Sequence, residues 1–353
     1  MFLHRFAALA FLGAALALPA GAYYDPPLPK KPSASVKVKI KRWYSGGSGL
    51  FMTSFPTPAS MWIPPDAEIL AGSTLDFRKM NTVLNVLSLE AQPVKNFSVE
   101  AEYGDNRFSG GNALDHDWLH APGHSIVFNE DVTWTEPDHK DFSLSRSDLS
   151  GSTRLCAVNV YARVYSSSKR ELFKRSADPE HNLDLYAGYG WYQDNIRISN
   201  GYQLLASDFV PGVTTPPVGP FSGLDSIYKM SWSGFRAGFR ERSRLSRTFA
   251  AEAKFAISPF ITYEGVGYWN LRPDLASPAF KHSAKGSVTE FSISAEWVPL
   301  RRLLVNAGYM GMFYKANGGV DRTFAADGTQ ADADLESVKT TRTGWFFSLA
   351  FKY

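Results

Sequence analysis

Side chains alternate in polarity along the last eleven residues of the chain, from Thr343 to Tyr353. Because successive side chains of a strand point to opposite faces, this alternation predicts a terminal β-strand with one apolar face. That face carries Trp345, Phe347, Leu349, Phe351 and Tyr353. An edge strand of a soluble β-sandwich would show the same pattern, so the segment is informative only if the rest of the chain repeats it.

The same period of two recurs along the chain and predicts about ten strands. We expect these strands at Val36 to Tyr44, Leu75 to Ala91, Phe97 to Tyr103, Thr153 to Tyr165, Leu183 to Ile198, Ser226 to Arg240, Phe249 to Trp269, Glu290 to Val298, Leu303 to Tyr314 and Thr343 to Tyr353. A phase shift near Gly234 indicates a bulge there, and Pro259 interrupts the seventh segment. With this repetition, a terminal strand that ends on an aromatic residue resembles the C-terminal signal of outer-membrane barrels.

The connections between these segments alternate between mostly short and long, as in barrels with periplasmic turns and extracellular loops. The long connections are Gly46 to Thr74, Gly104 to Ser152, Ser199 to Asp225, Asn270 to Thr289 and Lys315 to Arg342. Open sheet edges would leave unpaired backbone groups in hydrocarbon, so the sheet must close. The predicted fold is therefore all-β: a closed antiparallel transmembrane β-barrel of about ten strands, with long extracellular loops, both ends in the periplasm and a polar lumen.

Residues 1–22 have the three parts of a secretory signal peptide: a weakly charged start, an apolar run and small residues before a cleavage point. The apolar run is shorter than the roughly 20 residues of a spanning helix, although a retained anchor is the alternative. Residues 23–35, rich in Pro and Lys, predict a periplasmic tail, and residues 36–353 predict the barrel. The expected location is the outer membrane of a diderm bacterium.

Composition excludes several classes of protein. After the first 22 residues no apolar run reaches the length of a transmembrane helix, and the mean hydropathy of −0.21 suits a barrel with polar loops and lumen. A formal charge of +3 does not suggest nucleic-acid binding. Cys156 is the single cysteine, so no intrachain disulfide can form. Its position on an apolar face predicts a lipid-facing side chain rather than a catalytic thiol.

The loop predicted after Tyr103 holds the densest set of polar side chains, beginning with Asp115, His116 and Asp117. Carboxylates two residues apart on an extended segment can face one pocket, and crowding raises the pKa of one of them for general-base work. A solvated acidic loop is the alternative. His116, His120 and His124 have helical spacing for a metal site, but Pro122 and Gly123 interrupt a helix, so no metal ligands are predicted.

Several motifs resemble the omptins, a family of ten-stranded outer-membrane endopeptidases. The most specific is Ser109-Gly110-Gly111-Asn112-Ala113-Leu114-Asp115-His116-Asp117-Trp118. Weaker matches are Leu75-Asp76-Phe77, Asp148-Leu149, Ala187-Gly188-Tyr189 and Tyr228-Lys229-Met230, in the family's strand order. The resemblance spans most of the chain from Val36 to Tyr353.

The resemblance implies that an aspartate pair faces an Asp-x-His pair across an outer cleft and holds a nucleophilic water. Asp115 and Asp117 fill the first half. The second half is missing, because the positions implied by spacing from Trp269 fall on Ala276 and Pro278. Asp274 and His282 are the nearest candidates, and Asp115, Asp117 and His282 are the predicted catalytic set.

We therefore expect a degenerate protease that serves as a surface binding or adhesion protein, with an active aspartic-type endopeptidase as the alternative. A passive pore ranks last, because side chains tend to fill small barrels. No cofactor is expected, although lipopolysaccharide is a possible structural lipid. The expected partners are outer-membrane lipid and an extracellular peptide or host-surface ligand, with no nucleic acid. Arg163, Arg236 and Arg240 are expected to line the lumen; they and Lys229 could instead contact lipid phosphates.

Overall fold

The computed structural model describes residues 34–56, 70–120, 127–128, 132–133, 139–167, 180–207 and 215–353. The predicted signal peptide and almost all of the predicted tail lie outside these residues. No helix within the described ranges is long and apolar enough to cross a membrane.

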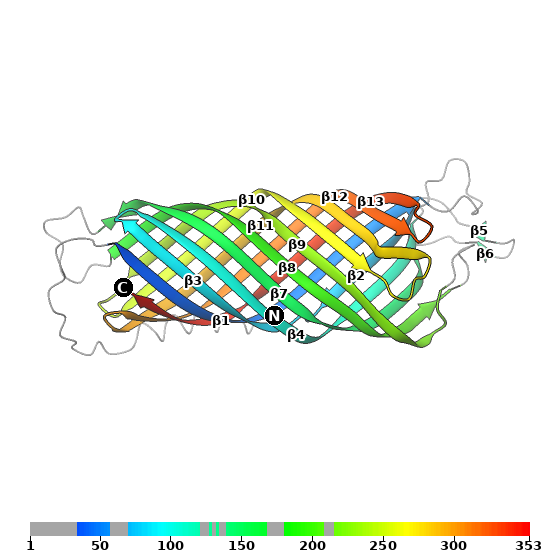
Figure 1. Ribbon diagram of the computed structural model, residues 1–353, viewed down its shortest axis with the longest axis horizontal. Coiled ribbons are helices and arrows are strands. Elements are labelled where there is room, and N and C mark those ends of the chain that lie inside the picture. The colour runs from blue at the N-terminus through cyan, green and yellow to red at the C-terminus, as the bar shows by residue number, and fades with distance from the viewer. Residues whose placement is uncertain are drawn as a thin grey trace.

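The described chain is built from antiparallel strands that close into one cylinder (Figure 1). The long strands are β1 (Ser35–Pro56), β2 (Leu70–Arg78), β3 (Thr82–Val94), β4 (Phe97–His120), β7 (His139–Ser166), β8 (Glu180–Ala206), β9 (Gly219–Arg244), β10 (Phe249–Tyr268), β11 (Leu275–Leu300), β12 (Leu303–Ala325) and β13 (Gln330–Lys352). Two short strands, β5 (Val127–Phe128) and β6 (Val132–Thr133), pair only with each other. Pairing of β13 with β1 removes both open edges, as the sequence predicted.

Strands β2 and β3 occupy one position in the wall. Both pair with β1 on one side and with β4 on the other, at different heights. The break between them contains Lys79, whose φ of 57° lies in the left-handed region. The ring therefore has ten positions, which confirms the predicted strand number, although the predicted strand Leu75 to Ala91 is two strands.

The strands are much longer than the sequence predicted. Segments expected as long loops are paired strand, and the connections left between β10 and β11 and between β12 and β13 are only residues 269–274 and 326–329. Asp115 and Asp117 accordingly lie on β4 and not in a loop. The prediction of loops was wrong because polar side chains are typical both of loops and of strands that extend into water.

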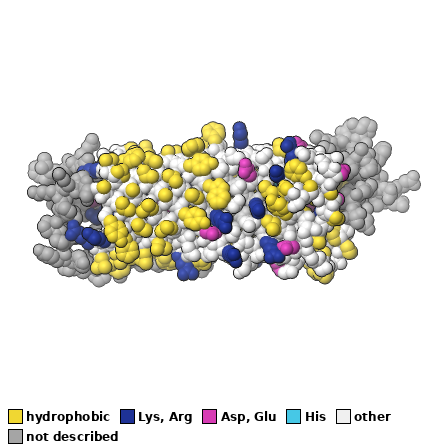
Figure 2. Space-filling view, viewed as in Figure 1, with side chains coloured by type: hydrophobic (Ala, Val, Ile, Leu, Met, Phe, Trp, Pro, Cys, Tyr) yellow, Lys and Arg dark blue, Asp and Glu magenta, His cyan; other side chains and the backbone are white. Residues whose placement is uncertain are grey.

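A belt of exposed apolar side chains surrounds the half of the barrel nearer the two ends of the described chain. It includes Ile40, Leu89, Val158, Leu185, Phe235, Phe260, Ile293 and Leu349. Figure 2 shows hydrophobic side chains gathered over this half, whereas charged side chains appear mainly beyond it. An exposed apolar band on a closed barrel marks the membrane-spanning part. We call the end with the described termini the terminal end and the opposite end the outer mouth.

The interior changes character along the cylinder. Within the belt, β1 points Lys37, Lys39 and Lys41 inward, which confirms the expected polar lumen. Farther along the same strand, Trp43 and Phe51 point inward and belong to a large buried hydrophobic core. The physical reason is the solvent outside: beyond the bilayer the barrel faces water, so its apolar side chains are buried inside. The expectation of a polar lumen throughout was therefore wrong for the outer half.

Two smaller predictions concern the outer wall. The irregularity expected at Gly234 lies on the neighbouring strand, where the pairing of β10 shifts between Ile257 and Ile261 around Pro259. Strand β9 pairs with β8 without a break past Gly234. Cys156 is exposed, which agrees with the predicted lipid-facing position.

Candidate functional site

Asp115 and Asp117 form an acid pair on the inner wall near the outer mouth. Asp115 is paired in register with Leu75, which is in turn paired with Phe51, and both apolar side chains are buried in the core. Register partners share a face of the sheet, so the carboxylate of Asp115 points inward, and so does that of Asp117 two residues later. Ser73 on β2 lies beside them, with its Oγ donating to Oδ1 of Asp115 at 3.5 Å.

The surroundings of the acid pair disfavour two negative charges. Burial and, next, the charge of Asp117 raise the pKa of Asp115 to about 8. Burial also raises the pKa of Asp117, against the opposing effect of hydrogen bonds from Ser73 and Ser143. The positive charge of Arg272 acts in the opposite direction on both pKa values. At neutral pH Asp115 therefore retains its proton.

His282 lies on β11 and points into the hydrophobic core. Its ring is fully buried, with its centroid 4.6 Å from that of Phe51 and 4.9 Å from that of Phe280. The hydroxyl of Tyr228 lies 2.8 Å from its Nδ1, and Oδ1 of Asp321 lies 3.2 Å from its Nε2. Neither carboxylate of the acid pair is a hydrogen-bond or ion-pair partner of this ring, so the three predicted catalytic residues do not form one polar cluster.

The turn between β10 and β11 contributes a different group to the mouth. Asp274 is held by Arg272 through two hydrogen bonds of 2.6 and 2.8 Å, and it has no contact with His282. Ala276 and Pro278, at the positions that the family resemblance points to, carry no titratable side chain. The segment thus presents a cation, Arg272, toward the acid pair where the resemblance implies an acid and an imidazole.

The histidines considered for a metal site are only partly described. His116 lies between Asp115 and Asp117 in the sequence, so its side chain points to the outer face of β4. There its Nε2 lies 2.6 Å from Oδ1 of Asp141. The side chain of His120 and all of His124 lie outside the described residues. Within the described ranges, no group of three or more His, Cys, Asp or Glu side chains has the geometry of a metal site.

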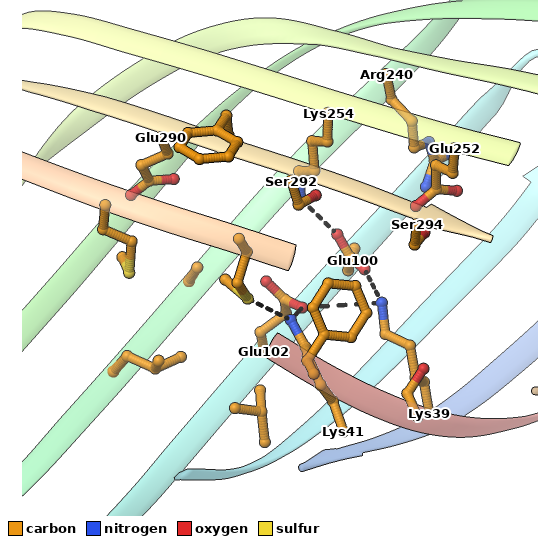
Figure 3. A pocket seen from close by; sticks show the side chains of 18 of the residues that line it. Lys39, Lys41, Glu100, Glu102, Arg240, Glu252, Lys254, Glu290, Ser292 and Ser294 are labelled. Carbon is orange, nitrogen blue, oxygen red and sulfur yellow. Dashed lines mark hydrogen bonds and ion pairs between the residues drawn. The ribbon is translucent and has the colours of Figure 1, made fainter. Parts of the chain in front are cut away.

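Inside the apolar belt, ion pairs cross the lumen. Glu100 on β4 accepts from Tyr161 at 2.6 Å and pairs with Lys254 at 3.1 Å and with Lys39 at 3.4 Å, so one carboxylate ties β1, β7 and β10 together. Figure 3 shows Lys39 and Lys254 pointing toward Glu100 from different strands of the wall. They surround a cavity of about 100 Å³. Charged side chains held in ion pairs of this kind occupy most of the lumen at this level.

Arginines form the other bridges. Arg240 lies 2.9 Å from both Glu90 and Asp184, and Arg236 pairs with Glu290. Both arginines thus line the lumen, as predicted. Arg163 pairs with Asp184 at 2.8 Å at the terminal end, which agrees with the same expectation.

The sequence did not identify three partners of the predicted site residues: Ser73 and Arg272 beside the acid pair, and Asp321 beside His282. Ser73 and Asp321 lie in segments that were expected to be loops, and each meets its partner only through cross-strand register. Arg272 was visible in the sequence beside Asp274, but nothing local indicated that it faces the acid pair. These partners lie on different segments, and the register between paired strands or the turn between β10 and β11 brings them to their targets.

Comparisons with known proteins agree with a barrel of the outer membrane. The family model "Pom: Protochlamydia outer membrane protein" matches residues 177–348. The crystal structure of the outer-membrane protease OmpT from Escherichia coli superposes with a TM-score of 0.65 at 13% identity, covering 92% of this chain and 99% of that chain. No curated protein matches the sequence.

Two further barrels are less similar. A Pseudomonas aeruginosa FadL homologue gives a TM-score of 0.29 at 10% identity, covering 91% of this chain and 90% of that one. The Pseudomonas putida toluene transporter TodX gives 0.23 at 7% identity, covering 91% and 89%. The superposition on OmpT confirms the omptin-like likeness at the level of fold, and with the family match it shows an outer-membrane β-barrel protein.

Proposed function

We propose that this chain is a surface barrel that binds a ligand at its outer mouth, on a protease-like scaffold that no longer cleaves peptides. The acid pair is the proposed ligand-binding element. The proposed ligand is an extracellular peptide or host-surface molecule that presents a positively charged group.

The burial of His282 carries this proposal. A hydrolytic water needs a base within hydrogen-bond reach, and an imidazole opposite the acid pair would supply it. Here Phe51 and Phe280 cover that imidazole, and its polar atoms face Tyr228 and Asp321. General-base catalysis commonly contributes about 10²–10⁴-fold, so its loss favours binding over turnover.

The chemistry of the acid pair supports a cationic ligand. A half-buried pair of acidic side chains stabilises an ammonium or guanidinium group that can donate to oxygens of both side chains. The positive charge of Arg272 already acts on both aspartates, although its guanidinium is hydrogen-bonded to Asp274, so a ligand cation would take the place next to the pair that Arg272 leaves open. A structural lipopolysaccharide remains part of the proposal, because the partly buried Lys229 follows the inward-facing Tyr228 and so points to the outer face of the wall.

The test uses the full chain reconstituted with lipopolysaccharide. Fluorescence anisotropy measures binding of a labelled peptide with two adjacent arginines against the same peptide with glutamines, and chromatography checks whether the peptide stays intact. We expect preference for the arginine peptide and no cleavage. The double variant Asp115→Asn, Asp117→Asn should weaken binding by roughly tenfold or more, which is typical for hydrogen bonds to charged groups.

Asp148→Asn is the matched control, since this aspartate is exposed on the neighbouring strand β7. Equal binding of both peptides, or an equal loss in the control, contradicts the proposal. The second candidate function is an active endopeptidase, favoured by the raised pKa of Asp115, which suits a proton-transferring group. Cleavage by the wild type that disappears in Asp115→Asn supports this second candidate and overturns the first.

A further inference from the structure

The short turns at the terminal end share one arrangement of side chains. The β3–β4 turn places Lys95 beside Val94, which is 61% exposed. The β11–β12 turn places Arg301 and Arg302 beside Leu300, which is 55% exposed. Each turn therefore puts an apolar side chain and a basic one at the same edge of the barrel.

The β9–β10 turn repeats the arrangement with Leu245, which is 43% exposed, and Arg247. Residues 94–97, 245–248 and 300–303 contain no Asp or Glu. We call Lys95, Arg247, Arg301 and Arg302 the basic collar.

Within the described part of the chain, the collar has no charge partners. All four side chains are exposed, and none has a carboxylate within ion-pair distance or a side-chain hydrogen bond among the described residues. This differs from the lumen, where Arg240 and Arg236 are held by carboxylates. Unpaired cations on three consecutive described turns at one end are available to an external anion.

The position of the collar identifies the kind of anion. Val94, Leu245 and Leu300 continue the apolar belt to its edge, and Trp297 and Tyr353 are exposed at the same end. Aromatic side chains on a barrel exterior gather at the boundary between hydrocarbon and headgroups. The collar therefore lies at headgroup depth. The longest connection, between β4 and β7, lies at the opposite end of the barrel, which marks the leaflet at the collar as the periplasmic one. Figure 2 shows basic side chains at this end, next to the hydrophobic band.

We infer that the basic collar binds the anionic phospholipid headgroups of the periplasmic leaflet and fixes the depth of the barrel in the membrane. Each lysine or arginine near a membrane surface strengthens attraction to anionic lipid by roughly fivefold at low salt. The apolar neighbour of each basic residue enters the hydrocarbon while the basic side chain extends to the phosphate. This surface is separate from the acid pair, so the inference does not depend on the proposed ligand binding.

The experiment uses the full chain in lipid nanodiscs made from phosphatidylcholine with a minor fraction of phosphatidylglycerol. Native mass spectrometry counts the phosphatidylglycerol molecules that remain bound after the surrounding lipid is stripped. We expect the wild type to retain phosphatidylglycerol in preference to phosphatidylcholine. The double variant Arg301→Gln, Arg302→Gln should lose roughly tenfold or more of this preference, and the variant with all four collar residues changed to Gln should lose nearly all of it.

The matched control is Arg146→Gln, Lys281→Gln, which removes two exposed basic residues on β7 and β11 beyond the belt. Its preference for phosphatidylglycerol should equal that of the wild type, and heat-dependent gel migration confirms that every variant is folded. An unchanged preference in the fourfold variant, or an equal loss in the control, overturns the inference. Loss of the wild-type preference at high salt supports it, because screening acts on exposed charges.

Discussion

Arg342 and Asp194 meet inside the barrel, with NH2 of the arginine 3.3 Å from Oδ1 of the aspartate, although they lie on strands from opposite sides of the ring, β13 and β8. The same guanidinium donates to Tyr192, Ser45, Thr153 and the carbonyl of Met80. Both charged side chains are almost completely buried. This pair joins the polar lumen to the hydrophobic core of the outer half.

Removal of Arg342 should strongly destabilise the barrel. Arg342→Met leaves Asp194 as a buried charge without its partner, which typically costs about 3–5 kcal/mol. Denaturant unfolding followed by tryptophan fluorescence measures the loss. The control Arg322→Gln breaks an exposed pair with Asp332 and should change the free energy of unfolding by less than about 1 kcal/mol. If both variants lowered the free energy of unfolding equally, the buried pair of Arg342 and Asp194 would not be a special source of stability.

Binding of a cationic peptide should strengthen as the pH rises through about 8. The pKa of Asp115 is raised to about 8, and only its ionised form adds its own negative charge to the acid pair. In Asp117→Asn the neighbouring charge that contributes to this rise is absent, so the midpoint should move to lower pH. Anisotropy titrations between about pH 5 and about pH 9 measure the midpoint.

The same raised pKa determines how Asp115 affects stability. The folded chain holds the proton more tightly than the unfolded chain, so the contribution of this group is favourable at low pH. It is lost as the pH rises from the ordinary aspartate pKa toward about 8.

In the binding titration, the control variant Asp148→Asn should leave the pH midpoint unchanged. A midpoint that stays the same or rises in Asp117→Asn contradicts the assignment.

Gly265→Ala should disrupt the polar cluster around His282. A Cβ at this position would lie 2.4 Å from the hydroxyl oxygen of Tyr228 and 2.8 Å from that of Tyr263, which hydrogen-bond to each other. Overpacking of this kind typically costs about 1–3 kcal/mol. The free energy of unfolding should therefore fall, whereas Gly46→Ala, whose nearest neighbour is a side-chain oxygen 3.3 Å away, should have little effect. Similar values for both variants would contradict this packing.

The barrel should not conduct ions. Glu100 is bridged to Lys39 and Lys254 across the lumen, and the outer half is filled by a hydrophobic core that includes Trp43 and Trp232. Recordings of the purified chain in planar lipid bilayers should show no channel steps. Reproducible unitary steps that disappear when the protein is omitted would instead demonstrate a continuous pore.

Much of the fold could be predicted from local pattern. Alternation at segments such as Val36 to Tyr44 and Thr343 to Tyr353 depends only on which face of a strand meets lipid, and it predicted ten wall positions and a closed sheet. The acid pair was found because Asp115 and Asp117 are two residues apart. The partners Asp321, Ser73 and Arg272 were not found, because they meet their targets through register between distant segments.

The sequence by itself determined that this chain spans an outer membrane as a closed sheet, since a period of two with an apolar face leaves few other structures in a bilayer. The tertiary structure decided how far the strands extend beyond the membrane, that His282 faces Asp321 and Tyr228, and that Arg342 reaches Asp194. The physical reason is that strand polarity is set residue by residue, whereas the contact between two side chains depends on the register between strands and, for Arg342 and Asp194, on the closure of the ring.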